Sequence, residues 1–224
     1  MTPQSSSMAS HRDLVRISLF AAMIAVFGLV PRLDLPFLAG VPITLQTLGV
    51  MLAGLFLKPK QAAYAVLLFL FVVCLGAPFL SGGRGGLGVL FGPSAGFLFG
   101  WVIGAWLVSV IIGLLLGRQP SPPVPSSNPP GLSAQMSHPH LAKKAFVACL
   151  IGGVPGIYCI GIPWLAWRAD MTLEAAAMVS LAFLPGDLLK AGFAAWLARQ
   201  LSREILMERR PLPAGPTPEG LSPP

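Results

Sequence analysis

Two opposite charges, Asp187 and Lys190, lie three residues apart in the segment FLPGDLLK at 183–190, which is otherwise apolar. Residues three apart on a helix share one face, so the two side chains can act together. A local alternative needs no ligand, because an aspartate in a first helical turn can cap free N–H groups and the lysine can neutralise it. At bilayer depth, however, each charge costs at least about 2.5–3.5 kcal/mol, and such groups usually face a cavity or a partner. We therefore interpret the pair as a functional site.

Two further segments carry polar residues within apolar sequence. Gln46 and Thr47 belong to the segment VPITLQT, and a buried amide there must find hydrogen bonds either from neighbouring helices or from a substrate. Arg84 is surrounded by glycines in the segment GGRGG, which allow close backbone approach to a ligand or to a neighbouring helix. A solvated arginine is the alternative for Arg84, and both readings stay open.

The composition places these residues in a membrane protein. Hydrophobic residues make up 54% of the 224 residues and charged residues 10%, against about 25% charged residues in soluble domains. The mean hydropathy is +0.75. A spanning helix needs roughly 20 mainly apolar residues. The sequence predicts an all-α polytopic membrane protein with six transmembrane helices and no removed signal peptide, its spans covering about 14–31, 42–57, 62–80, 93–117, 142–165 and 185–205.

The distribution of basic residues predicts the orientation, because Lys and Arg collect on the cytoplasmic side. With the N-terminus inside, the cytoplasmic face receives most of them: Arg12, Arg16, Lys58, Lys60, Arg118, Lys143, Lys144, Arg199, Arg203, Arg209 and Arg210. Only Arg32, Arg84 and Arg168 fall outside. We expect both termini in the cytoplasm and a multi-pass protein of the plasma membrane. The net charge of +7 could also suggest that the protein binds nucleic acid. We set this function aside because the sequence shows no basic groove with interleaved aromatic residues.

The chain divides into one membrane domain and three polar segments. The membrane domain covers 14–207 and follows a cytoplasmic N-terminal tail at 1–13. A cytoplasmic linker at 119–141 and a tail at 208–224 are rich in proline, and we expect them to stay flexible because they cannot bury apolar surface. The cysteines and histidines lack metal-ligand spacing, so no metal or cofactor is predicted.

Prolines predict where two helices begin at the outer side. Proline suits the first turn of a helix and costs about 3 kcal/mol inside one. The fourth span is therefore expected to start near Pro93, next to Ser94, and the sixth near Pro185, after a short helix at 173–183. Asp187 then lies in a first helical turn near the outer mouth. Both helix starts would direct positive dipole ends to one region, which would suit a ligand carboxylate.

Small residues predict close helix packing. Gly92, Gly96, Gly100 and Gly104 recur every four residues, and internal packing is the favoured explanation. Ala21 and Ala25 repeat this spacing in the first span, where internal packing and docking of a partner are the two alternatives.

Three ordered segments resemble one protein family: VPITLQT at 41–47, GGRGG followed by LFGPSAGF at 82–97, and FLPGDLLK at 183–190. They look like the signature blocks of BioY, the biotin-specific substrate-binding S component of energy-coupling factor (ECF) transporters. The similarity runs from about residue 14 to 205 and departs from the family in the long linker and tail. The resemblance implies a membrane subunit that captures biotin outside and hands it inward.

The resemblance also implies partners. Two ATPase subunits and a transmembrane T component would supply energy, with Ala21 and Ala25 as the docking surface on the first helix. The sequence contains no G-x-x-x-x-G-K-[ST] motif of its own. Operation without such a module and formation of a homo-oligomer are alternatives that the sequence leaves open.

The same resemblance suggests roles for site residues. Asp187 would accept hydrogen bonds from the ureido N–H groups of biotin, and Lys190 would donate to the ureido oxygen. Gln46 and Tyr158 would add orienting hydrogen bonds, while Arg84 and the helix start at Ser94 would meet the carboxylate. Apolar walls are expected from aromatic residues: Phe91, Phe97 and Trp164.

Three other functions compete with biotin transport. An S component for another vitamin would keep the fold and change the ligand. An intramembrane enzyme would use Asp187 as a general base, but the sequence shows no Ser/His pair, no metal cluster and no second carboxylate within a span, so we predict that the protein is not an enzyme. A purely structural subunit would leave the cost of the buried charges unexplained.

Overall fold

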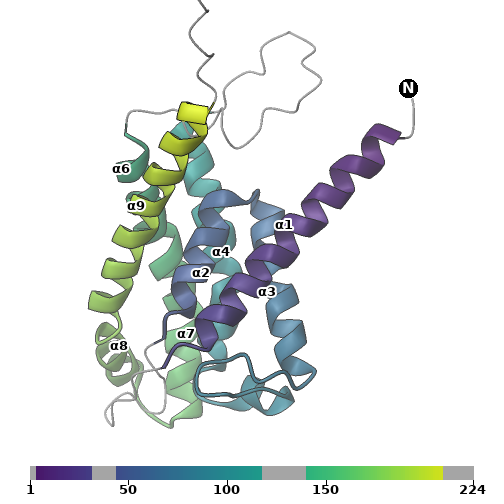
Figure 1. The fold of residues 1–224 in the computed structure, drawn as a ribbon. Coiled ribbons are helices and arrows are strands. Elements are labelled where there is room, and N and C mark those ends of the chain that lie inside the picture. The colour runs from purple at the N-terminus through teal and green to yellow at the C-terminus, as the bar shows by residue number, and fades with distance from the viewer. Residues whose placement is uncertain (1–3, 32–43, 118–139, 209–224) are drawn as a thin grey trace, which may run out of the picture.

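The computed structural model describes residues 4–31, 44–117 and 140–208. Within these ranges the chain is helical, and the one extended pairing is an isolated antiparallel bridge between Leu80 and Arg84. The helices run up and down, so that α1 (Gln4–Gly28) and α3 (Pro59–Cys74) end where α2 (Gln46–Phe56) and α4 (Ala95–Leu116) begin (Figure 1). This end of the bundle carries most of the polar residues singled out by the sequence.

Helix α4 lies at the centre of the bundle and packs against α2, α3 and α7 (Val154–Arg168). Its glycines at 96, 100 and 104 face α7. A methyl group on Gly100 would lie 2.5 Å from the carbonyl oxygen of Ile157, and one on Gly104 would lie 2.9 Å from the Ile157 side chain. The glycines therefore serve the internal packing that their spacing favoured. Gly92 lies before the helix and does not share in this contact.

The start of α4 differs slightly from the proline-based prediction. The helix begins at Ala95 with Ser94 as its N-cap residue, and the preceding segment forms a short 3-10 helix, η2 (Leu87–Phe91). The carbonyl oxygen of Gly92 accepts a hydrogen bond from the Ala95 N–H, with an N–O distance of 3.1 Å. The turn around Pro93 therefore leads directly into the helix.

The next helical stretch is continuous but irregular. Helix α6 (Leu141–Ala148) passes through a π-helical turn, η3 (Cys149–Gly153), into α7. At this turn a methyl group on Gly152 would lie 2.7 Å from the backbone nitrogen of Val108, so the two backbones approach closely. The wide turn thus lies where the helix packs tightly on α4.

The last apolar stretch is broken, as its proline predicted. Helix α8 (Leu173–Leu181) and helix α9 (Leu184–Glu208) meet at a bend of 49°. The hydroxyl of Thr172 caps α8 by accepting from the Ala175 N–H at 3.2 Å. Asp187 lies in the first turn of α9. The bend therefore brings the charged pair to the same end of the bundle as the start of α4.

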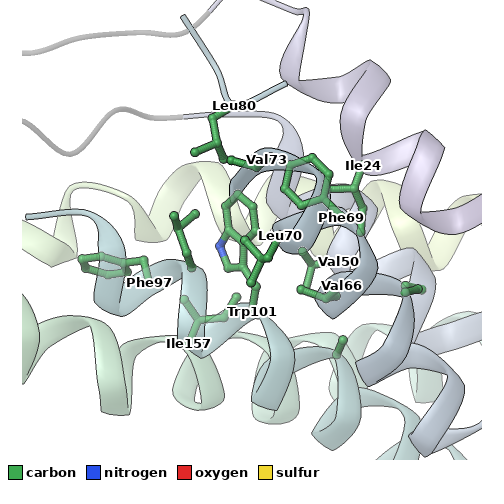
Figure 2. Packing of buried hydrophobic residues seen from close by; sticks show 14 of the residues in the cluster. Ile24, Val50, Val66, Phe69, Leu70, Val73, Leu80, Phe97, Trp101 and Ile157 are labelled. Carbon is green, nitrogen blue, oxygen red and sulfur yellow. The ribbon is translucent and has the colours of Figure 1, made fainter. Parts of the chain in front are cut away.

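Two apolar clusters hold the helices together. The first joins α1, α3, α4 and α7, and Figure 2 shows Phe69 and Trp101 at its centre, with ring centroids 6.2 Å apart. The second joins α2, α4, α6 and α9, where small residues such as Ala191, Ala194 and Ala198 let α9 pack closely. The pocket described below lies over the first cluster.

Two described helices are long and apolar enough to cross a membrane, Ala95–Leu116 and Leu141–Arg168, and the bent pair α8 and α9 can form a third span. Helices α2 and α3 are apolar but shorter, with 11 and 16 residues. Helix α1 begins at Gln4, inside the segment predicted as an N-terminal tail. The six-span topology stays a prediction, and most of the predicted linker at 119–141 and tail at 208–224 lies outside the described residues.

Candidate functional site

A pocket opens at the end of the bundle where α2, α4 and α9 begin and α7 ends. It contains about 560 Å³ of empty space, counting the part that is open to solvent. Its lining comes from five segments of the chain: Thr44, Gln46, Thr47, Leu80, Arg84, Ser94, Phe97, Leu98, Trp101, Ile157, Tyr158, Phe183, Asp187 and Lys190. The structure thus brings together all six residues that the sequence proposed for substrate binding.

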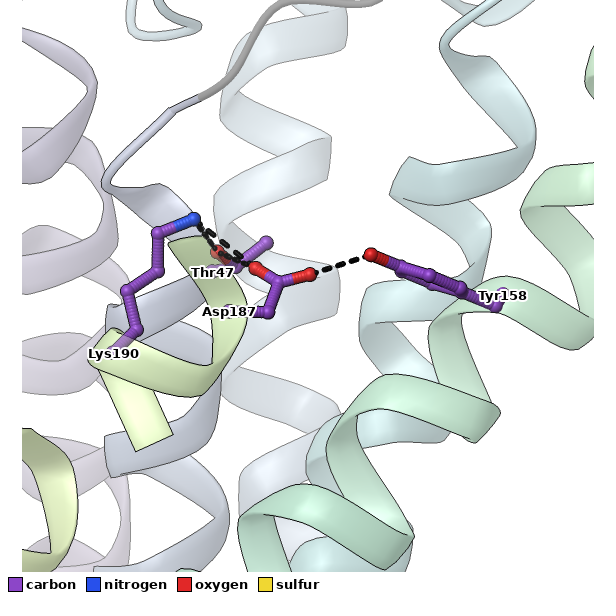
Figure 3. Close-up of polar contacts among 4 residues, drawn as sticks. All are labelled: Thr47, Tyr158, Asp187 and Lys190. Carbon is purple, nitrogen blue, oxygen red and sulfur yellow. Dashed lines mark hydrogen bonds and ion pairs between the residues drawn. The ribbon is translucent and has the colours of Figure 1, made fainter. Parts of the chain in front are cut away.

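Asp187 is the centre of one polar end of the pocket (Figure 3). Its side chain is 7% exposed. The Lys190 Nζ lies 3.1 Å from Oδ1, and the Tyr158 hydroxyl donates to Oδ2 at 2.8 Å. Thr47 completes the group, because its hydroxyl accepts from Lys190 at 2.8 Å and donates to Oδ1 at 3.4 Å. The carboxylate therefore connects α2, α7 and α9, which favours a site over simple capping of its own helix.

This group presents donors and acceptors side by side. A buried charge is stabilised only if it is paired and hydrogen-bonded, and Asp187 and Lys190 meet that condition through each other and through two hydroxyl groups. Hydroxyl groups can donate or accept, so the four residues can rearrange their hydrogen bonds around a polar ligand. Thr47 was noted in the sequence but not assigned to the site, because it is 143 residues from Lys190 and only the fold brings them together.

Arg84 forms the second polar end. It lies on a tight hairpin in which Leu80 and Arg84 exchange backbone hydrogen bonds of 3.1 and 3.2 Å. The guanidinium donates from Nε to the carbonyl oxygen of Ser81 and from one terminal nitrogen to the hydroxyl of Ser94, both at 3.4 Å. Ser94 is the N-cap residue of α4, so a positive side chain and the positive end of a helix dipole converge there. This combination suits an anion.

Apolar residues make up much of the remaining lining. The ring of Phe97 contacts those of Tyr158 and Phe183 edge to face, with centroids 6.1 and 5.9 Å apart. Of the three aromatic walls expected from the sequence, Phe97 lines the pocket, but two do not. Phe91 is exposed on η2, and Trp164 donates its indole N–H to the carbonyl oxygen of Gly92 outside the lining.

Gln46 borders the pocket, yet its amide is engaged by the protein. The side chain is fully buried. Its Nε2 donates to the carbonyl oxygens of Ile24 and Phe79 at 3.4 and 3.1 Å, and its Oε1 accepts from the backbone N–H and the hydroxyl of Ser81, both at 3.1 Å. An amide offers two donors and one acceptor oxygen with two lone pairs. The sequence left open whether these hydrogen bonds come from the protein or from a substrate. In the structure they come from neighbouring segments of the protein.

The two small residues proposed for docking on α1 take part in the apolar packing of the bundle. Ala21 is 7% exposed and belongs to the first apolar cluster, and Ala25 packs against that cluster. The neighbouring small residues Ser18 and Ala22 are exposed. The docking role of this helix stays a prediction.

The fold and the pocket together define a helical membrane protein with a pocket of mixed polarity for a small molecule. The chain matches the model of the BioY family over residues 1–206 and belongs to this family. It is 42% identical over 193 residues to the probable biotin transporter BioY of Bacillus subtilis, covering 86% of this chain and 91% of that protein. It is 43% identical over 190 residues to the biotin transporter BioY of Rhizobium etli, covering 85% and 92%.

The fold also has a solved counterpart. The S-component for biotin from an ECF-type ABC transporter superposes with a TM-score of 0.73 at 26% identity, covering 91% of this chain and 95% of that one. The family suggested by the three sequence segments is therefore confirmed.

Proposed function

We propose that this protein is a biotin uptake subunit, which binds biotin from outside in the pocket and delivers it inward. The observation that carries the proposal is the lining of the pocket, which combines a charge pair, an arginine and apolar side chains. Biotin offers groups that suit each of them: a polar ureido ring, an apolar thiophane ring and a carboxylate tail. The names of the similar proteins support the same ligand.

The ureido ring is assigned to the Asp187 end. A ureido group has two N–H donors and one carbonyl oxygen, and the neighbouring carboxylate and ammonium of Asp187 and Lys190 offer the complementary acceptor and donor. Tyr158 and Thr47 hold the pair in place. As ligand N–H groups approach Asp187, the Tyr158 hydroxyl can release its hydrogen bond and orient toward another acceptor.

The carboxylate tail is assigned to the Arg84 end. A guanidinium and the first turn of α4 favour a negative charge, and Ser94 contributes a hydroxyl group. Phe97, Trp101 and the other apolar lining residues suit the thiophane ring and the methylene tail.

The wider organisation is part of the same proposal. We place the protein in the plasma membrane with six spans and both termini in the cytoplasm. A transmembrane T component and two ATPase subunits energise transport, and the protein itself is not an enzyme. Helix α1 is the proposed docking surface: Ala21 and Ala25 supply the spacing of small residues, and their neighbours Ser18 and Ala22 are exposed.

Mass spectrometry of the protein after mild purification tests the ligand. We expect biotin to co-purify, and titration calorimetry of the emptied protein should show saturable binding of biotin and no binding of riboflavin or thiamine. Recovery of a different vitamin, with no heat of binding for biotin, would contradict the proposal in favour of an S component for that vitamin.

A further inference from the structure

Gln46 connects three segments that lie far apart in the sequence. The Gln46 Nε2 donates to the carbonyl oxygens of Ile24 on α1 and of Phe79 after α3. The Gln46 Oε1 accepts two hydrogen bonds from Ser81. Within the described residues no buried side-chain nitrogen or oxygen lacks a hydrogen-bond partner, and the Gln46 amide is part of that complete pairing. A change at Gln46 therefore leaves several buried groups unpaired at once.

Gly28 shows how closely these segments approach. A methyl group added to Gly28 would overlap the carbonyl oxygen of Phe79 and would lie 2.8 Å from the Gln46 Nε2. Only a glycine lets the end of α1 meet the loop at this distance. The hydrogen bonds of Gln46 thus belong to a tightly packed junction.

The junction leads directly to Arg84. Ser81 uses its N–H to bind the Gln46 oxygen and its carbonyl oxygen to accept from the Arg84 Nε. The hairpin closes through the backbone hydrogen bonds between Leu80 and Arg84 around two glycines with positive φ. Because such a glycine-rich turn has little stiffness of its own, its position depends on what holds Ser81.

We infer that Gln46 is a positioning residue that holds the Arg84 hairpin at the pocket, and that it thereby sets the preference for a ligand with an anionic tail. Gln46 acts through Arg84 and does not bind the ligand itself. This inference rests on the proposed function, since it concerns recognition of the carboxylate of biotin.

The test compares biotin with biotinamide, whose tail is neutral. Calorimetry on purified Gln46→Met should show a loss of roughly tenfold in biotin affinity, because a hydrogen bond to a charged group is typically worth about this factor or more. Biotinamide affinity should change by less than about twofold. Equal losses for both ligands, or no loss for either, would overturn the inference.

A double variant separates positioning from direct contact. If Gln46 acts through Arg84, Gln46→Met should have no further effect on biotin affinity in an Arg84→Met background, since the two residues act as one unit. Additive losses would mean that Gln46 contacts the carboxylate independently and would also overturn the inference.

Gln61→Met is the matched control. Gln61 is another buried glutamine, whose oxygen accepts from the Lys58 N–H at 3.2 Å at the opposite end of the bundle. This variant should leave the ratio of the two affinities unchanged. If Gln46→Met does not fold, Ser81→Ala removes one of the four hydrogen bonds and should lower biotin affinity alone by roughly twofold to threefold.

Hydrogen exchange tests the positioning without any ligand. The amides of Ser81 and Arg84 should exchange faster in Gln46→Met than in the wild type, while helix α4 keeps its protection. Unchanged exchange in the hairpin would overturn the inference. If the wild type binds neither biotin nor biotinamide, the proposed function fails, but the exchange result still decides the structural role of Gln46.

Discussion

The two polar ends of the pocket are built in different ways. At the Asp187 end, every polar side chain projects from a helix, and their hydrogen bonds run from 2.8 to 3.4 Å. At the Arg84 end, the charged side chain lies on a five-residue hairpin, and its hydrogen bonds to Ser81 and Ser94 are both 3.4 Å long. Helices hold a group by packing along their length, whereas a hairpin depends on a few local hydrogen bonds.

This difference indicates a division of roles. The Asp187 end is preorganised for a rigid polar ring whose donors and acceptors must be matched closely. The Arg84 end meets a charge at the tip of a flexible tail, which demands less exact geometry. We therefore expect substitutions at the Asp187 end to reduce binding of every biotin analogue and those at the Arg84 end to affect only analogues with a carboxylate.

The largest effect is expected for Asp187→Asn. The change removes the acceptor for the ureido N–H groups and leaves Lys190 without its counter-ion, and truncating a buried charge pair costs about 3–5 kcal/mol. Biotin and biotinamide should both lose at least about 100-fold in affinity by calorimetry. Glu174→Gln, a carboxylate exposed on α8, is the control and should bind like the wild type. Wild-type affinity in Asp187→Asn would remove the charge pair from the site.

Arg84→Met is expected to have the next largest effect, restricted to one ligand. Biotin affinity should fall by roughly tenfold to 100-fold with loss of a charge-assisted contact, and biotinamide affinity should stay close to that of the wild type. Arg168→Met removes another arginine, which donates to the carbonyl oxygen of Phe91 outside the pocket. If that control shows the same selective loss, the general positive charge matters rather than Arg84.

Tyr158→Phe should have a smaller effect. It removes the hydroxyl that donates to Asp187 at 2.8 Å while keeping the ring that contacts Phe97. A loss of about threefold to tenfold is expected, equal for biotin and biotinamide, because one hydrogen bond contributes about 1 kcal/mol. Tyr64→Phe, on the exposed side of α3, is the matched control. A loss confined to biotin would place Tyr158 at the carboxylate and so reverse the assignment of the two ends.

Ala22→Trp should leave both ends of the pocket unchanged. Because Ala22 is exposed, the variant should bind biotin with wild-type affinity but no longer co-purify with a T component. Ala21→Trp places a large ring in the apolar core and should lower the thermal stability of the protein in detergent. Undiminished co-purification of Ala22→Trp would exclude this face of α1 as the docking surface.

Much of this organisation follows from local sequence. Proline is unfavourable in the interior of a helix and is tolerated in its first turn. Pro185 therefore made it possible to predict the break before α9 and the position of Asp187 in its first turn. The glycines of α4 at positions 96, 100 and 104 predicted a close helix contact by their spacing. The three segments that resemble BioY identified the family, and the comparison with known proteins confirms it.

Other features were not predictable because they depend on which faces meet. Ala21 and Ala22 are neighbours of the same type, yet one is buried in the core and the other is exposed. Gln46 is in a segment that suggested ligand binding, but its partners come from α1 and from the loop after α3. Similarly, Thr47 is a neighbour of Lys190 only because α2 and α9 pack close together.

The sequence by itself determined the type of protein, the breaks between its helices and the polar residues that an apolar chain would keep only for a function. These follow from the cost of exposing apolar surface to water, from the geometry of proline and from the cost of charge in a membrane. The tertiary structure alone decided that Thr47 and Tyr158 hydrogen bond directly to the Asp187 and Lys190 pair, and that Arg84 lines the same pocket. Contacts between residues more than 100 positions apart depend on how whole helices pack, and that packing is set by all of their side chains together.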